Sequence, residues 1–243
     1  MTQEYLSQDG SRFIEHAAPG VHALAVQMLG VGKSATVLDV PSGGGALAQR
    51  LADQGYAQVV CGDIVNGLPP DCSLPFLLLD LNAKADPGRQ FDAILCIECI
   101  EHLENPFHLL RTLSSWLRPG GELIISTPNV MSAAARSKFL TAGYFPYFSE
   151  LAYRWDELRA QGFMGHVMPV PATMMLYGAE QAGFRFGDLK TNGHLRRPGL
   201  KDRLIAFLVR LGSRRHYSRQ VYELLTSETV LFGDVLIFKF IKQ

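Results

Sequence analysis

The sequence lacks the long apolar runs, the excess of one charge and the secretory leader that mark several classes of protein. No apolar stretch approaches the roughly 18–20 residues of a membrane span, and the richest runs, such as Leu77–Leu79 and Leu123–Ile125, have the length of strands. The 243 residues include 23 Lys and Arg against 23 Asp and Glu, so a globally basic nucleic-acid binder is excluded. The N-terminal MTQEYLSQDG has no basic residue and no apolar core behind it, which predicts no signal peptide and no transmembrane segment.

Cysteine is scarce, and its pattern is that of buried thiols. The four cysteines, Cys61, Cys72, Cys96 and Cys99, lie in or beside apolar runs, as is typical of a reducing compartment. Cys96 and Cys99 form a C-x-x-C, but no second such pair exists to complete a zinc site. The sequence therefore predicts a cytoplasmic protein, and a chain of this length with 47% hydrophobic residues needs no disulfide or structural metal to build a core.

Short apolar runs alternate with helical patterns, which predicts a parallel sheet with crossover helices. The predicted strands cover 37–40, 58–64, 75–81, 91–97, 122–127 and a short run at 184–186. The predicted helices cover 46–55, 106–117 and 171–182. The final run, 231–241, is expected to pair antiparallel at the edge of the sheet or next to it. The pattern predicts an α/β chain with a doubly wound, mostly parallel sheet and an antiparallel C-terminal strand.

We expect one domain over 1–243 with three additions to this pattern: an N-terminal helical segment, 1–34, an insertion at 130–170 and a basic helical insertion at 192–228. The first insertion is too long for an ordinary connection and is rich in aromatic residues, which predicts either a lid over a pocket or a small hydrophobic subcore. Its aromatic residues are Phe139, Tyr144, Phe145, Tyr147, Phe148, Tyr153 and Trp155.

The basic insertion concentrates charge in a neutral chain. Residues 196–219 contain eight basic residues and one acidic residue, Asp202, a local charge of +7. Apolar residues at helical spacing run through the same stretch: Leu200, Leu204, Phe207, Leu208 and Leu211. One interpretation is a helix docked on the domain with a solvated basic face, and the other is contact with an anionic acceptor or a membrane surface.

A strand, a glycine-rich turn and a helix follow one another at 37–55. This order predicts a ligand close to the main chain at the carboxyl end of the first strand. Asp63 ends the second strand, 20 residues after Gly43, and matches the acid that accepts hydrogen bonds from ribose hydroxyls in nucleotide-binding βαβ units. Together these features predict an adenosine-type cofactor, and the alternative is a tight turn with a surface aspartate.

The segment VLDVPSGGGALAQRLADQG followed by VVCGDI resembles the first two motifs of the class I S-adenosylmethionine-dependent methyltransferases. FDAILCIECIEHLENPFHLLRTLSSWLRPGGELIISTPN is similar to the strand–helix–strand that follows in that family. The resemblance covers residues 35–130, and GHVMPV…GAEQAGF at 165–184 extends it. It implies a Rossmann-like methyltransferase fold, S-adenosyl-L-methionine as cofactor and S-adenosyl-L-homocysteine as product. The layout looks most like bacterial O-methyltransferases acting on glycans or natural products.

The resemblance also implies a cofactor site. Asp39 and Gly43–Gly45 would face the methionine portion of the cofactor, Asp63 the ribose hydroxyls and Asp80 the adenine amino group. The full implied set is Asp39, Ser42, Gly43, Gly44, Gly45, Asp63, Ile64, Asp80, Leu81, Cys96, Ile97 and Glu98. Pro41 stands where the family usually has glycine, and because proline removes a donor and fixes φ, we expect the turn to approach the cofactor differently here.

Methyl transfer from an activated donor needs mainly in-line positioning of the acceptor, and a hydroxyl acceptor also benefits from a general base. The candidate catalytic residues are Glu101 and His102 in ECIEH and His166 in the GHV turn, and the alternative is that Glu101 and His102 brace the next helix. The remaining histidines are expected to be structural or on the surface: His16, His22, His108, His194 and His216.

Glu98, Glu101, His102 and a later histidine also resemble the metal site of small-RNA 3′-terminal 2′-O-methyltransferases, and are similar to O-methyltransferases of quinone biosynthesis. Two carboxylates and two imidazoles suit a divalent ion that lowers the pKa of a hydroxyl. Many relatives share ExxEH without requiring a metal, so we predict none here.

We therefore predict S-adenosylmethionine-dependent methyl transfer to a hydroxyl of a small molecule or glycan intermediate. One alternative is a non-catalytic S-adenosylmethionine-binding module. A second is an NAD-dependent dehydrogenase, which shares the glycine turn and Asp63 but not the segment 91–129. A third, a nucleic-acid methyltransferase, would use the +7 stretch.

Overall fold

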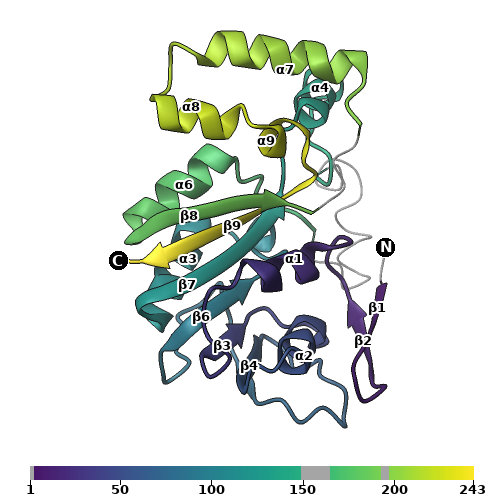
Figure 1. Ribbon diagram of the computed structural model, residues 1–243, viewed down its shortest axis with the longest axis vertical. Helices are drawn as coiled ribbons and strands as arrows, with labels where there is room; N and C mark the ends of the chain where they lie inside the picture. The colour runs from purple at the N-terminus through teal and green to yellow at the C-terminus, as the bar shows by residue number, and fades with distance from the viewer. Residues whose placement is uncertain (1–2, 149–164, 193–196) are drawn as a thin grey trace.

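The computed structural model describes residues 3–148, 165–192 and 197–243. Within these residues, seven strands form one mixed sheet in the order β5-β4-β3-β6-β7-β9-β8, with helices on both of its faces (Figure 1). The C-terminal strand β9 pairs antiparallel with both neighbours, and the other pairs are parallel. The strands are β3 (Thr36–Asp39), β4 (Gln58–Asp63), β5 (Phe76–Leu78), β6 (Phe91–Cys96), β7 (Leu117–Pro128), β8 (Phe184–Thr191) and β9 (Val235–Lys242). The predicted fold class is confirmed.

Two hydrophobic clusters hold the layers together because successive strand residues point to opposite faces. On one face, Val37 and Leu95 pack with α1 (Val21–Met28) and α2 (Ala46–Asp53). On the other face, Leu38 and Ile94 pack with the second pair of helices. These helices are α3 (Pro106–Trp116) and α6 (Ala172–Gln181).

Helix α3 begins where the sequence predicts. The side chain of Asn105 accepts a hydrogen bond from the amide of His108 at 2.9 Å, and Pro106 occupies the first turn, where its missing N–H leaves no partner unsatisfied. The helix ends at Trp116, and Leu117 already belongs to β7. The predicted helix 106–117 therefore ends one residue too late, and residues 119–121 lie inside β7.

The expectation of a helical N-terminal segment over 1–34 is wrong for its first half. The strands β1 (Gln3–Leu6) and β2 (Arg12–Glu15) form an antiparallel hairpin, and only α1 is helical. The reason is a period of two: Phe13 and Glu15 are buried, whereas Arg12 and Ile14 are exposed. Gly10, with φ of 88°, allows the chain to reverse between the strands.

The remaining helices surround the carboxyl end of β7 and the far edge of the sheet (Figure 1). They are η1 (Ile100–His102), α4 (Ala133–Ala142), α7 (Leu200–Ser213), α8 (Arg219–Leu225) and α9 (Glu228–Phe232). The predicted final strand starts too early, because Leu231 still belongs to α9, which Ser227 caps. No helix of the described residues is long and apolar enough to cross a membrane. Among the residues singled out from the sequence, Tyr153, Trp155, His194 and Arg196 lie outside the described residues.

Candidate active site

A cavity of about 300 Å³ lies at the carboxyl ends of β3, β4 and β6. This is where doubly wound sheets place their ligands, and the volume is at the lower end of the range for small-molecule sites. Four connections after strands line it, together with part of the N-terminal segment. The lining residues are Ile14, His16, Ala17, His22, Pro41–Gly44, Ala46, Asp63, Ile64, Leu79–Asn82, Ile97–Cys99, His102 and Leu103.

The glycine turn is fixed against the end of β4. The amide of Ser42 donates to the carbonyl of Gly62 at 2.9 Å, and the amide of Gly43 donates to the Asp63 carboxylate at 2.8 Å. Gly43 has φ of 50°, and a Cβ built there would meet no atom within 4 Å, so its open side leaves room for a ligand against the backbone. Pro41, whose peptide bond to Val40 is cis, lines the cavity beside this turn.

Two aspartates present carboxylates to the cavity from neighbouring strand ends. Asp63 accepts the amide of Gly43 through one oxygen and its neighbour's amide, that of Ile64, through the other at 2.7 Å. Asp80 accepts the amide of Asn82 at 2.9 Å. An ionised carboxylate has about four acceptor positions, so each aspartate retains capacity for a ligand's hydroxyl or amino group.

Three residues predicted to contact the cofactor lie behind the cavity wall. Asp39 is buried, its carboxylate accepts the amide of Ala48 at 3.1 Å, and burial raises its pKa well above the usual range. Gly45 begins α2, and a Cβ there would lie 2.6 Å from a methyl carbon of Leu68 rather than in the cavity. Cys96 is fully buried in the core. Residue spacing alone does not separate the cavity wall from the layer behind it.

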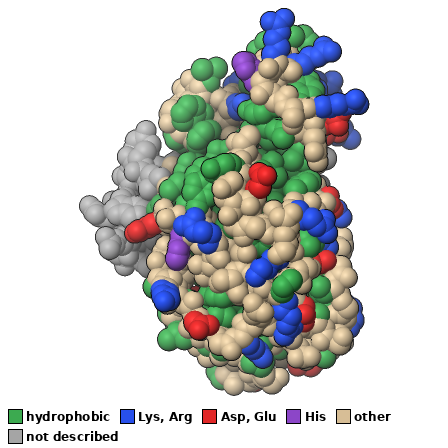
Figure 2. Space-filling view, turned by 90° about the vertical axis from the view of Figure 1, so that its left-hand side faces the viewer, with side chains coloured by type: hydrophobic (Ala, Val, Ile, Leu, Met, Phe, Trp, Pro, Cys, Tyr) green, Lys and Arg blue, Asp and Glu red, His purple; other side chains and the backbone are tan. Residues whose placement is uncertain are grey.

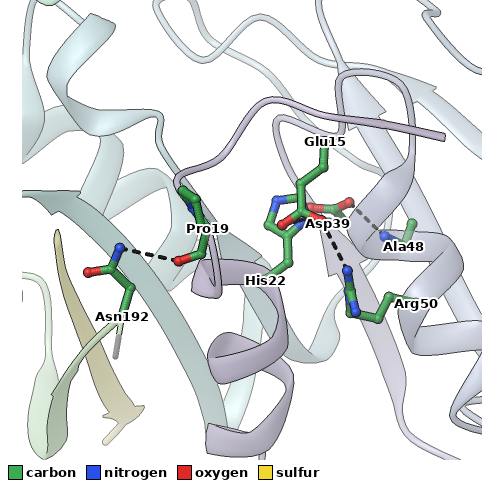
Figure 3. A network of polar contacts seen from close by, with 7 residues as sticks. All are labelled: Glu15, Pro19, His22, Asp39, Ala48, Arg50 and Asn192. Atoms are coloured by element: carbon green, nitrogen blue, oxygen red, sulfur yellow. Dashed lines mark hydrogen bonds and ion pairs between the residues drawn. The ribbon is translucent and has the colours of Figure 1, made fainter. Parts of the chain in front are cut away.

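The N-terminal segment contributes a wall of the cavity that the sequence did not predict. His16 and His22 line the cavity, although both were expected to be structural or on the surface. Glu15 holds the segment in place: its carboxylate lies 3.0 Å from the Arg50 guanidinium of α2 and 3.4 Å from Nδ1 of His22 (Figure 3). The sequence carries no signal for this wall, because the alternating burial of Arg12–Glu15 is visible only in the structure and the residue types Arg, Phe, Ile and Glu do not alternate.

Burial also sets the protonation of His22. It lowers the pKa of His22 to about 4, and the charges of Arg50 and His16 act in the same direction. The nearby Glu15 carboxylate is already neutralised by Arg50, so it gives a second cation little stabilisation. At the far end of this network, the amide of Asn192 donates to the carbonyl of Pro19 at 3.3 Å and ties the segment to the end of β8 (Figure 3).

Two predicted catalytic histidines come together across 64 residues of sequence. The carbonyl of Glu101 accepts the amides of Val167 at 2.8 Å and Met168 at 2.9 Å, which fixes the GHV turn against η1. The rings of His102 and His166 then lie edge to face with their centres 4.6 Å apart. His102 lines the cavity, and its Nδ1 lies 3.2 Å from the carbonyl oxygen of Gly165.

Glu101 places a buried carboxyl group beside this histidine pair. Neither of its side-chain oxygens has a hydrogen-bond partner among the described residues, and burial, with the charge of Glu98, raises its pKa well above the usual range. Burial and the charge of His102 lower the pKa of His166 to about 4, so the His166 imidazole is neutral near pH 7. One potential ligand atom from each of Glu101, His102 and His166 lies within 4.8 Å of the others.

Glu98 stands apart from that cluster. Its backbone is in the left-handed region, with φ of 50°, and its side chain and amide both bond the hydroxyl of Ser126 at 2.8 Å. Burial raises the pKa of Glu98. Of the four residues that resemble a metal site, the structure therefore gathers three, and Glu98 remains part of the cavity wall.

Comparison with known proteins assigns the family. A model described as a methyltransferase domain matches residues 12–185. The chain belongs to this family. The methyltransferase domain is 30% identical over 168 residues to the mitochondrial ubiquinone biosynthesis O-methyltransferase of Arabidopsis thaliana, covering 63% of this chain and 50% of that protein. The corresponding enzyme of Xanthomonas campestris pv. campestris strain B100 is 37% identical over 122 residues, covering 45% and 50%.

The methyltransferase domain thus spans about half the length of the curated relatives it matches. Among solved structures, an S-adenosylmethionine-dependent methyltransferase from Mesorhizobium loti has a TM-score of 0.53 at 15% identity, covering 90% of this chain and 96% of that chain. The cyclopropane synthase MmaA2 from Mycobacterium tuberculosis has a TM-score of 0.56 at 21% identity, covering 91% and 82%. Such identities show the fold alone, which hosts different reactions. The predicted family is confirmed, and the predicted cofactor agrees with it.

Proposed function

We propose that the chain catalyses S-adenosylmethionine-dependent methyl transfer to a hydroxyl group of a small molecule or a glycan intermediate. The observation that carries this proposal is the cavity at the carboxyl edge of the sheet, with Asp63 and the glycine turn in one wall and His102 in another. S-adenosylmethionine, when bound, supplies a methyl group that is already activated for transfer. The chain's own task is then to hold the cofactor, align the acceptor and receive its proton.

The cavity wall fits a nucleoside cofactor. The Asp63 carboxylate stands at the end of β4, where it can accept the hydroxyls of a ribose, and Asp80 stands after β5, where it can accept an adenine amino group. Gly43, where a Cβ would meet no atom within 4 Å, leaves the backbone of the turn open to the cofactor. Ser42, Ile64, Leu81 and Ile97 also line this cavity, as a cofactor role for them requires.

His102 is the proposed general base. An N–H at Nδ1 that donates to the carbonyl of Gly165 leaves Nε2 with the lone pair that accepts the proton of the acceptor's hydroxyl. Glu101 and His166 position this ring from behind, through the edge-to-face contact and the turn held by the Glu101 carbonyl. The rings of Tyr147 and Phe148 lie 6.5 and 5.3 Å from that of His166, which supports a lid role for the described part of the insertion 130–170.

A second candidate is a divalent metal ion held by Glu101, His102 and His166, in the same transfer. The favouring observation is that neither buried oxygen of Glu101 has a partner in the part of the chain that the structure describes, because buried polar atoms are rarely left unsatisfied. Carboxylate and neutral imidazole groups suit Mn²⁺, Co²⁺ or Zn²⁺, and such an ion lowers the pKa of a hydroxyl that approaches it.

Calorimetry with S-adenosylmethionine, S-adenosylhomocysteine and NAD tests the cofactor. We expect binding of the first two, and Asp63→Ala should weaken it at least tenfold, about 1.4 kcal/mol. Asp86→Ala is the matched control, because Asp86 accepts a backbone amide as Asp80 does but lies outside the cavity. Binding of NAD without affinity for S-adenosylmethionine would overturn the proposal.

A turnover assay separates the base from the metal, once a panel of phenols, catechols and hydroxylated glycan precursors yields an acceptor. His102→Ala should reduce turnover by about 10²-fold while cofactor affinity stays intact. Chelation followed by metal analysis is the second arm, since activity that survives removal of all bound metal eliminates the metal. Cofactor binding without any turnover across the panel supports the non-catalytic binding module instead.

The proposal also includes a cytoplasmic location and a methyl acceptor that is not a nucleic acid. All four cysteines are free, and Cys61, Cys96 and Cys99 are buried, which supports a reducing compartment such as the cytoplasm. The neutral net charge argues against a nucleic-acid acceptor. The seven-stranded sheet contributes residues to both hydrophobic clusters, one on each of its faces, and we therefore propose that 1–243 is one domain.

A further inference from the structure

Helix α7 turns its apolar stripe away from the rest of the molecule. The stripe residues Leu200, Leu204, Phe207, Leu208 and Leu211 are between 55% and 88% exposed. The helix packs instead through the opposite face, where Ala206 is fully buried and Ile205 and Val209 are partly buried. The helix is docked on the domain with its basic residues in solvent, as one interpretation of the sequence expects, but it docks through this face and leaves the apolar stripe in solvent as well.

Basic side chains border this stripe. At about 100° per residue, Arg203 and Arg210 fall along one edge of the stripe and Lys201 along the other. Arg214 and Arg215 follow at the end of the helix, and all five are exposed. Figure 2 shows Lys and Arg side chains projecting beside hydrophobic ones at the upper end of the molecule, the end that α7 occupies in Figure 1.

The neighbouring helix α4 also exposes basic and apolar side chains. It packs against α7, and its last turns expose Lys138, Phe139 and Leu140. We call these three residues, the α7 stripe and its five basic neighbours the α7–α4 surface. Since α4 follows the carboxyl end of β7, this surface lies toward the same edge of the sheet as the cavity.

We propose that the α7–α4 surface docks the protein on the surface of a bilayer that contains anionic phospholipids. The stripe has the arrangement of an interfacial amphipathic helix: large apolar side chains in the centre reach the acyl boundary, and the basic side chains at the edges reach the headgroups. The inference concerns attachment and does not depend on which methyl acceptor is used.

The charge pattern of the α7–α4 surface favours an anionic bilayer over a second copy of the chain or a nucleic acid. A second copy of the chain would bring two clusters of exposed arginines face to face. Asp202, the one acidic residue of 196–219, would not offset this repulsion, because it is turned to the packed side of α7 and accepts the amide of Gly199 at 3.1 Å. A nucleic acid would engage the basic edges but leave Leu204, Phe207 and Leu211 in water. A bilayer surface accommodates both parts.

Vesicle flotation of the full chain tests the proposal. We expect binding to phosphatidylcholine vesicles that contain phosphatidylglycerol, weak binding to phosphatidylcholine alone, and a decrease as salt rises. The triple variant Arg203→Gln, Arg210→Gln, Arg214→Gln should bind the anionic vesicles about a hundredfold more weakly, or about fivefold per arginine. The control removes three exposed cations elsewhere: Lys84→Gln, Arg111→Gln, Arg185→Gln.

A second pair of variants tests the apolar stripe. Leu211→Glu should abolish flotation, whereas Leu78→Glu, at an equally exposed leucine on β5, should leave it unchanged. Unchanged thermal unfolding of both variants confirms that folding is intact. The proposal is overturned if the wild-type chain does not float, if control and test variants lose binding equally, or if sedimentation shows a dimer or an RNA complex that Leu211→Glu disrupts while vesicle binding persists.

Discussion

Replacing Arg50 with Met tests how the N-terminal segment is fastened over the cavity. The Arg50 guanidinium lies 3.0 Å from the Glu15 carboxylate, and the two side chains are 22% and 6% exposed. Met keeps the unbranched apolar stem of the arginine, so the substitution removes mainly the guanidinium group and its charge. Glu15 would then be left buried without its principal partner.

The expected loss is about 3 kcal/mol of unfolding free energy, the lower end of the range for breaking a buried ion pair, because Arg50 is partly solvated. The chain contains a natural control in the pair Arg219–Glu223, which has nearly the same separation, 2.9 Å, but side chains 93% and 61% exposed. Arg219→Met should cost only about 0.3–0.5 kcal/mol, as is usual for pairs four residues apart on a helix surface. The expected losses of unfolding free energy differ because the Arg50–Glu15 pair is buried and the Arg219–Glu223 pair is exposed.

Urea denaturation without lipid measures both variants, and calorimetry measures their affinity for S-adenosylmethionine. Arg50→Met should also weaken cofactor binding, because Ile14 and Ala17 of the fastened segment line the cavity. Adding Glu15→Gln to Arg50→Met should recover part of the stability, since it removes the uncompensated charge. Equal losses for the Arg50 and Arg219 variants would refute the reasoning, and so would a double variant as unstable as the sum of the two single ones.

Two further measurements test the surroundings of the cavity. Burial lowers the pKa of His22 to about 4, so the imidazole gains a proton near pH 6.5 in the unfolded chain but not in the folded chain. The free energy of unfolding should therefore fall by about 3 kcal/mol as the pH drops from 6.5 toward 4. His22→Gln should remove that part of the pH dependence, which urea denaturation measures. Gly45→Ala should cost about 1 kcal/mol more in thermal unfolding than Gly183→Ala: both glycines have φ of 82°, but only the Cβ at position 45 collides, with the terminal methyl group of Leu68. Equal costs at the two glycines would show that Leu68 moves aside freely.

The elements that the sequence predicted well are those determined by local rules. Asn105 and Pro106 specify the start of α3 whatever the rest of the chain does. The apolar strand runs place β3, β4 and β6 side by side, which puts Asp63 and His102 at one edge of the sheet. Because the carboxyl ends of parallel strands share an edge, most of the cavity wall followed from the order of the strands.

The errors concern features that depend on distant partners. The sequence of α7 carries apolar residues on two nearly opposite faces, Leu204 and Leu211 on one and Ile205 and Val209 on the other. Periodicity finds the longer stripe, but only the surrounding structure decides which face packs. The role of Glu15 was hidden for the same reason, because its partners are Arg50 and His22, on two different helices.

The position of β9 has a consequence for folding during synthesis. This strand is synthesised after both β7 and β8, yet it lies between them and is the partner of both. Until residues 235–242 emerge, β7 and β8 each present an unpaired row of backbone N–H and C=O groups, at a time when the apolar stripe of α7 is already in solvent. The nascent chain therefore passes through a late interval in which it is exposed to aggregation and to chaperones, and the addition of a single strand ends that interval.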